Sequence, residues 1–153
     1  MRAARSLGFC LLFLSGCAVA CTCADRRLSE QEQLTRAFDD ATLVVVARVG
    51  KLAANAGESI VITTGDAQVL ESLKSSGEPP SHLPIQMRAS REGYTSSCGE
   101  GADLHEGDYL LLYLSEARIT ESSFDYCLRN KVAKRRAEFE NEVARLRILA
   151  GEG

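Results

Sequence analysis

The fold is decided by one β-branched run, Leu43-Val44-Val45-Val46-Ala47-Arg48-Val49. Valine favours extended backbone because its branched side chain packs well on a pleated surface. The apolar residues are continuous instead of alternating with polar ones, so the pattern predicts a strand over Thr42–Leu52 that is buried on both faces for most of its length. A turn at Asn55-Ala56-Gly57 follows it.

Four further runs of extended character come after this strand. The first is Ser59–Leu73, and Gly65 in its middle predicts a bulge or bend of the kind that a small barrel needs. The others are expected at Leu83–Ser90, Tyr109–Leu114 and Arg118–Cys127. Five strands of uneven length with a bend at glycine favour a small β-barrel, closed or partly open.

Helices are expected on either side of the strands in the chain. Ser29 and Glu32 have the spacing of a capping box, which predicts a short helix over Ser29–Asp39. From Asn130 or Lys131 onward, apolar residues fall on one side of a helical pattern: Val132, Phe139, Val143, Leu146 and Leu149. The expected fold class is mainly β with flanking helices, a five-stranded OB-like barrel plus a C-terminal amphipathic helix.

The start of the chain has the order of an export signal. Arg2 and Arg5 precede a short apolar stretch, and small residues end at Ala20. Cleavage after Ala20 would make residues 1–20 a signal peptide and residues 21–153 a single exported domain, secreted or periplasmic.

A second processing signal overlaps the first. Leu14-Ser15-Gly16-Cys17 matches a bacterial lipobox, in which residues 1–16 are removed and Cys17 is lipidated. This route would anchor the domain to the cell envelope. The two routes exclude each other, and the sequence leaves both open.

Four cysteines follow Ala20, namely Cys21, Cys23, Cys98 and Cys127. An even number of cysteines in an exported chain predicts two disulfides. Cys21 and Cys23 lie two residues apart, about 6 to 7 Å in an extended chain, and a bridge between them would close a strained ring. Each is therefore expected to pair with one of the two distant cysteines, which leaves two pairings open.

Composition argues against several classes of function. The chain has 18 Lys and Arg against 21 Asp and Glu, and it lacks a basic block outside the last predicted helix, which argues against nucleic-acid binding. His82 and His105 are the only histidines, so the sequence gives an enzyme little support, and no cofactor is expected. We interpret Asp103, His105, Glu106 and Asp108 as a solvated loop in preference to a cation site.

Four features, taken in chain order, resemble the N-terminal domain of the tissue inhibitors of metalloproteinases, a netrin-like module with an OB fold. They are Cys21-Thr22-Cys23 at the mature start, the apolar strand Leu43–Gly50, Ser97-Cys98-Gly99, and Cys127 after the last strand. The resemblance covers nearly the whole of residues 21–153 and describes an exported member of bacterial type.

The resemblance implies a pairing for the cysteines. The first would bond to the cysteine of the Ser-Cys-Gly turn, giving Cys21–Cys98, and the other bridge would be Cys23–Cys127. Both bridges close long loops. On a chain-entropy model, each bridge would stabilise the folded state by about 4 kcal/mol.

The resemblance also implies a mechanism of inhibition. The α-amine and carbonyl of Cys21 would chelate the catalytic zinc of a partner metalloprotease, while the side chain of Thr22 enters its specificity pocket. Thr95, Ser96 and Ser97 would form a second contact segment next to the first. The domain would hold no metal of its own and act as a monomer.

The sequence departs from the family pattern in three ways. A third disulfide and the cysteine-rich C-terminal subdomain of the family are absent, and Ser97 replaces an apolar contact residue. If Cys17 is lipidated, Cys21 carries an amide and cannot chelate, and only then would the domain touch a membrane. A non-inhibitory netrin-like binding or structural module therefore stands as the alternative function.

Overall fold

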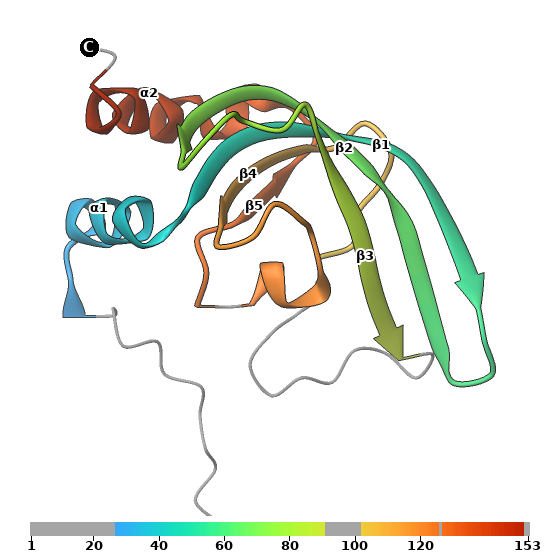
Figure 1. The fold of residues 1–153 in the computed structure, drawn as a ribbon. Helices are drawn as coiled ribbons and strands as arrows, with labels where there is room; N and C mark the ends of the chain where they lie inside the picture. Colours follow the sequence, from blue (N-terminus) through green and yellow to red (C-terminus); the bar gives the residue numbers. More distant parts are fainter. Residues whose placement is uncertain (1–26, 91–101, 126, 152–153) are drawn as a thin grey trace, which may run out of the picture.

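The computed structural model describes residues 27–90, 102–125 and 127–151 (Figure 1). The described chain is mainly β: five strands form one sheet in the order β3-β2-β1-β4-β5, and every pairing along it is antiparallel. In chain order the elements are α1 Glu30–Asp40, β1 Leu43–Ala56, β2 Ile60–Ser75, β3 His82–Ser90, β4 Tyr109–Leu114, the 3-10 turn η2 Glu121–Phe124, β5 Lys131–Ala133, the 3-10 turn η3 Arg136–Phe139, and α2 Glu140–Leu149. No helix among these residues is long and apolar enough to cross a membrane.

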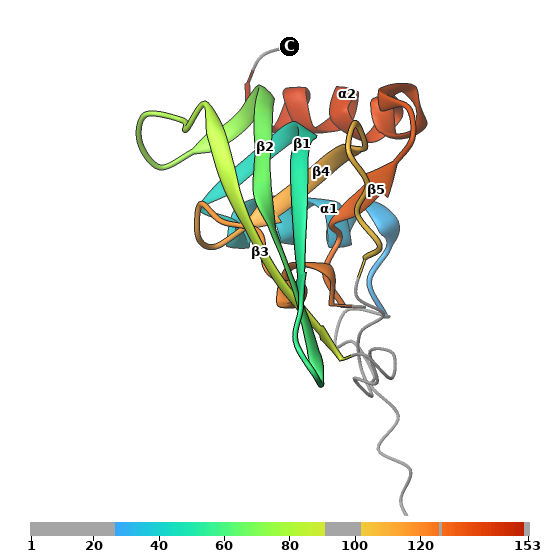
Figure 2. The ribbon, with the colours of Figure 1, turned by 90° about the vertical axis from the view of Figure 1, so that its right-hand side faces the viewer.

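The first half of β1, Leu43–Val49, is buried on both faces apart from Arg48, as its sequence predicts. The second half is largely exposed and continues through Asn55 and Ala56, which are paired strand residues and not part of the predicted turn. Val44 and Val46 belong to a helix-facing cluster that includes Leu34 of α1 and Leu146 of α2. The alternate residues of β1 belong to an interior cluster on the other side of the sheet: Leu43, Val45, Ala47 and Val49. Figures 1 and 2 show α1 and α2 along the outer side of the curled sheet. One strand therefore supplies both hydrophobic layers.

The sheet is curled and barrel-like but not closed, since no ladder joins β3 to β5 in the described part of the chain. One parallel bridge pairs Ile85 of β3 with Ile119. The Ile119 amide donates to the Pro84 carbonyl at 2.9 Å, and the Gln86 amide donates to the Ile119 carbonyl at 2.9 Å. The Arg88 amide, further along β3, donates to the Glu121 carboxylate at 3.3 Å. The mainly β, barrel-like fold with flanking helices is confirmed.

Helix α1 begins and ends with specific caps. The predicted capping box is present: the Ser29 hydroxyl accepts from the Glu32 amide, and the Glu32 carboxylate accepts from the Ser29 amide at 2.8 Å. At the other end, the Lys74 ammonium donates to the carbonyls of Phe38 and Asp39 at 2.7 and 2.8 Å. These bonds use orphan carbonyls of the last turn and fasten α1 to β2.

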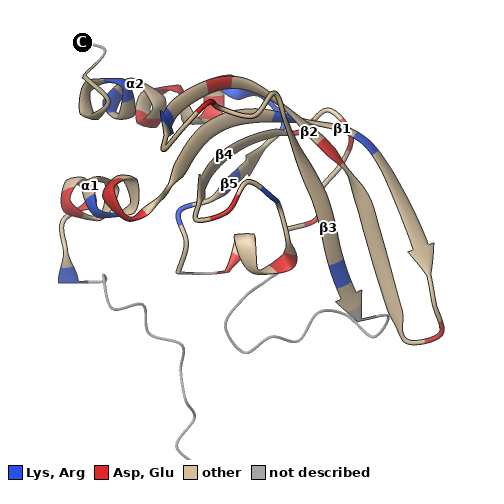
Figure 3. Ribbon diagram, in the orientation of Figure 1, with Lys and Arg blue, Asp and Glu red and all other residues tan. Residues whose placement is uncertain are grey.

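Ion pairs join α2 to its neighbours. Glu71 of β2 accepts from Arg147 at 2.8 Å and also pairs with Arg136, while Arg145 donates to Glu30 of α1 at 2.8 Å. Figure 3 shows acidic and basic positions mixed along both helices. The hydrogen bond from Arg147 is the main reason why the pKa of Glu71 lies below its ordinary value.

The prediction for the end of the chain was wrong in two respects. Arg118–Cys127 is not a strand: Ile119 makes a single bridge, η2 follows, and the fifth strand is Lys131–Ala133, paired with Tyr109–Leu111. The C-terminal helix does not start at Asn130 or Lys131, because that stretch is β5; helical structure begins with η3, and α2 starts at Glu140. Pairing with β4 outweighs the helical pattern there.

The bend predicted at Gly65 is confirmed. Val49 pairs with Ala67 and Leu52 pairs with Gly65, so two residues of β1 face the single residue Asp66 of β2. This count is that of a β-bulge, which increases the local twist of the sheet.

Candidate functional site

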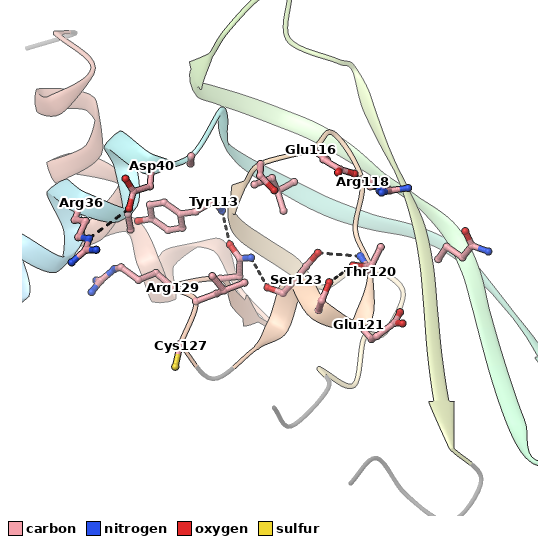
Figure 4. Close-up of a pocket in the computed structure, with 18 of the residues that line it drawn as sticks. Arg36, Asp40, Tyr113, Glu116, Arg118, Thr120, Glu121, Ser123, Cys127 and Arg129 are labelled. Carbon is pink, nitrogen blue, oxygen red and sulfur yellow. Dashed lines mark hydrogen bonds and ion pairs between the residues drawn. The ribbon is translucent and has the colours of Figure 1, made fainter. Parts of the chain in front are cut away.

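A groove of about 870 Å³ lies between one face of α1 and the segment that follows β4. Its size is within the range of small-ligand sites. Figure 4 shows Arg36, Asp40, Tyr113 and Arg129 toward one end of the view and Glu116, Arg118, Thr120 and Glu121 toward the other. The lining residues are Gln33, Arg36, Ala37, Asp40, Ala41, Gln86, Arg88, Tyr113, Leu114, Ser115, Glu116, Arg118, Thr120, Glu121, Ser122, Ser123, Cys127, Leu128, Arg129 and Asn130.

Behind this groove lies a buried carboxylate, Glu142 of α2, which is 3% exposed. It accepts hydrogen bonds from the Tyr113 hydroxyl at 2.7 Å, from Arg129 Nη2 at 3.0 Å and from Lys131 Nζ. Burial alone would raise the pKa of Glu142, but the bonds from Lys131, Tyr113 and Arg129 outweigh it and hold the pKa below its ordinary value. Glu142 is therefore a fixed negative charge.

Contact with Glu142 also shifts the pKa values of the two groove residues bonded to it, Tyr113 and Arg129. Burial, together with the hydrogen bond to Glu142, raises the pKa of Tyr113. Burial works against the charge of Arg129, yet the bond to Glu142 raises the pKa of its guanidinium overall. Tyr113 thus stays neutral and Arg129 charged across the physiological range.

Asn130 fixes the chain beside Arg129. Its side-chain carbonyl accepts from the Tyr113 amide of β4, and its side-chain amide donates to the Ser123 carbonyl of η2. The backbone that carries Arg129 is consequently tied to a strand and to a turn at once. The groove wall at this end is preorganised.

Most residues of the sequence-predicted contact site lie outside the described residues: Cys21, Thr22, Cys23, Thr95, Ser96, Ser97 and Cys98, together with Cys17. The predicted pairings stay predictions for the same reason. Cys127 is described; it lines the groove and is disulfide-bonded. Every other cysteine of the chain lies outside the described ranges.

The described chain begins beside the same groove. Gln33 Nε2 donates to the Leu28 carbonyl at 2.9 Å, and Gln33 is itself a lining residue. In the view of Figure 4, the Cys127 sulfur points away from the labelled side chains. The groove thus adjoins both the entry of the N-terminal segment and Cys127.

The acidic loop before β4, which contains Asp103 and Asp108, is held by Lys134 from outside the loop. Asp108 is buried and accepts from Lys134 Nζ at 2.8 Å and from the His105 amide at 3.0 Å. Asp103 lies 3.7 Å from the His105 ring. Across the described ranges, no group of three or more His, Cys, Asp or Glu side chains is placed to hold a metal ion.

Glu142 was not among the site residues expected from the sequence. A signal was present, because Glu142 follows Phe139 by three residues and precedes Leu146 by four, which places it on the buried face. A charged residue in an apolar stripe predicts a paired, buried ion.

No protein-family model matches the chain, and no curated protein matches it.

Proposed function

We propose that the protein is an exported, disulfide-stapled domain resembling the inhibitor domain of the tissue inhibitors of metalloproteinases, and that it inhibits a zinc metalloendopeptidase through Cys21. The observation that carries the proposal is that Cys127 lines the same groove as Gln33, whose side chain holds the Leu28 carbonyl. Cys23 precedes Leu28 by five residues, a span of at most roughly 18 Å of extended chain. A bridge from Cys23 to Cys127 is therefore compatible with the fold.

The chemistry requires an N-terminal Cys21. A catalytic zinc keeps one coordination position open for water or substrate. An α-amine with a pKa of about 7.7 to 8 can give up its proton on binding and fill that position together with the adjacent carbonyl oxygen. Disulfides from Cys21 and Cys23 would hold these two atoms rigid before contact, which lowers the ordering cost of association. Thr22 would occupy the pocket that selects the substrate side chain.

Processing is the first test. The intact mass and N-terminal sequence of the exported protein distinguish a free Cys21 from a lipidated Cys17. A free Cys21 is expected. A diacylated Cys17 would eliminate zinc chelation.

The second test is a titration of a zinc metalloendopeptidase with mature protein that begins at Cys21. A variant with one extra alanine before Cys21 displaces the amine from the zinc, so we expect its inhibition to fall by at least about a hundredfold, which is about 2.7 kcal/mol. A matched variant with one alanine added after Gly153 should inhibit like the parent. Equal potency of both variants, or no inhibition by the parent, contradicts the mechanism.

The alternative function is a non-inhibitory binding module, lipid-anchored through Cys17. The groove favours this alternative, because its preorganised lining comes from residues that take no part in zinc chelation. Ligand binding at the groove combined with a lipidated N-terminus would support it.

A further inference from the structure

Arg129 has unused hydrogen-bonding capacity beside the groove. Its Nη2 donates to Glu142 at 3.0 Å, but its buried Nε has no hydrogen-bond partner among the described residues. A guanidinium carries five N–H donors in a planar fork whose geometry matches a carboxylate. The side chain is 17% exposed, and Arg129 is one of the residues that line the groove.

The guanidinium is also held in place. Glu142 fixes Arg129, and Glu142 is itself fixed by Lys131 and by the Tyr113 hydroxyl. The asparagine that follows Arg129 is bonded to β4 and to η2. A ligand that binds Arg129 therefore has little ordering entropy to overcome on the protein side.

The other charges of the groove restrict the kind of anion. Four arginines line it against three carboxylates: Arg36, Arg88, Arg118 and Arg129, and Asp40, Glu116 and Glu121. Asp40 lies 3.6 Å from Arg36, Glu116 pairs with Arg118, and Glu121 accepts from the Arg88 amide. A phosphate dianion would be repelled by three nearby carboxylates, whereas a single carboxylate on an otherwise neutral chain matches the excess of one cation.

The rest of the lining suits a peptide. Hydroxyl and amide side chains can bond to peptide groups, and the lining combines them with small or aliphatic residues: Gln33, Gln86, Ser115, Thr120, Ser122 and Asn130, with Ala37, Ala41 and Leu128. Tyr113 is the one aromatic residue among the described lining, whereas sugar or base ligands rely on several stacking rings.

We propose that this groove binds a peptide segment that bears a carboxylate, with Arg129 as the anion-binding residue and Arg36 as a second cation at the same end. The carboxylate is supplied either by a chain terminus or by an acidic side chain, which present the same chemistry to the guanidinium. The proposal rests on the groove alone and stands or falls separately from zinc chelation.

Calorimetric titration of the full mature protein tests the proposal with three acetylated tripeptides. They are Ala-Ala-Ala with a free carboxylate, Ala-Glu-Ala amide and Ala-Gln-Ala amide. At least one of the two carboxylate peptides is expected to bind about tenfold or more tightly than the neutral one, a difference of about 1.4 kcal/mol, and the affinity should fall with added salt. The tighter of the two identifies the source of the carboxylate.

Variants then locate the site. Arg129→Lys keeps the charge opposite Glu142 but loses the fork, and Arg36→Gln removes the second cation; each should weaken binding about fivefold or more. Arg135→Gln is the matched control, since that side chain is 82% exposed and outside the groove lining. Thermal unfolding shows whether each variant is folded. If Arg129→Lys does not fold, the affinity of Arg36→Gln decides the test. Equal affinity for the neutral peptide, no binding up to about 10 mM, or unchanged affinity in the folded variants overturns the proposal.

Discussion

Glu142 is a single carboxylate that connects three parts of the molecule. Its partners come from β4, from β5 and from the loop between η2 and β5: Tyr113, Lys131 and Arg129. Removing a partner from a buried ion pair leaves an uncompensated charge and commonly costs about 3–5 kcal/mol. The position of α2 against the sheet therefore depends on this one side chain as well as on apolar packing.

The same contact makes stability depend on pH at both ends of the scale. The folded-state pKa of Glu142 is lowered, so its contribution is present above its ordinary pKa and is lost as pH falls through the lowered value. The folded-state pKa of Tyr113 is raised, so its contribution is fully present below its ordinary pKa, about 10, and is lost as pH rises toward the raised value.

We predict that Tyr113→Phe reduces the alkaline loss of stability. The parent protein should lose free energy of unfolding above about pH 10, because an unfolded tyrosine ionises there and the folded one resists ionisation. The variant should be less stable than the parent at pH 7 by about 1.5–3 kcal/mol, the usual value of a hydrogen bond to a charged group. Urea unfolding between pH 7 and 11 measures both effects, and parallel curves for the two proteins would contradict the assignment.

At the scale of elements, the bulge where β1 meets β2 depends on the absence of a side chain at Gly65. A Cβ built there would clash with the Lys51 carbonyl oxygen and would lie 2.8 Å from Leu52 Cδ2. The backbone oxygen cannot move without shifting the strand that carries it. Gly65 is needed for close approach and not for a positive φ.

We predict that Gly65→Ala destabilises the protein by about 1–3 kcal/mol, the range for overpacking. Gly77→Ala is the matched control, because a Cβ at Gly77 meets nothing within 4 Å. The control should be neutral or slightly stabilising, since alanine restricts the unfolded chain. Thermal and urea unfolding of the two variants provide the comparison, and equal stabilities would show that the bulge can relax at no cost.

The strands up to Leu114 and the first helix could be predicted because each has a strong local signal. The β-branched run of β1, the glycine in β2 and the Ser29 capping box all act within a few residues. The end of the chain lacks such a signal. Lys131–Ala133 becomes a strand only because β4 offers a free edge there, and the Ser123 hydroxyl accepts from the Thr120 amide within a turn that replaces the expected strand.

The groove could not be predicted from sequence, because its lining comes from three stretches that lie far apart in the chain, within residues 33–41, 86–88 and 113–130. Gln33 lies on α1, Gln86 on β3, Leu114 on β4, Ser122 on η2 and Asn130 in the loop before β5. None of these residues carries a motif, and only the three-dimensional fold brings them together. The cysteine pattern, by contrast, was visible at once because it depends on residue type and spacing alone.

At the scale of the whole molecule, β1 couples the two hydrophobic layers. Val44 packs in the helix-facing cluster and its neighbour Val45 in the interior cluster, and neither is exposed to solvent. If β1 leaves one hydrophobic cluster, the apolar residues of the other cluster also become exposed to solvent. The described domain should therefore unfold as one cooperative unit.

We predict that Val44→Ala and Val45→Ala each lower the free energy of unfolding by about 1–3 kcal/mol, from lost burial and the cavity left behind. In each variant, the transitions followed by far-ultraviolet and near-ultraviolet circular dichroism should coincide. Leu70→Ala, at a side chain that is 40% exposed, is the surface control and should change stability much less. A separate helical transition in Val44→Ala would show that the layers are independent.

The outer edge of β3 has a consequence for how copies of the molecule meet one another. Unpaired amides and carbonyls along a sheet edge can recruit a strand from another molecule and seed aggregation. Here the Pro84 carbonyl and the Gln86 amide are bonded to Ile119, and the Arg88 amide is bonded to a carboxylate. Proline also has no amide hydrogen to offer. The hydrogen-bonding groups in this middle stretch of β3 are therefore already paired within the molecule. At high protein concentration this disfavours the growth of an intermolecular sheet from this edge.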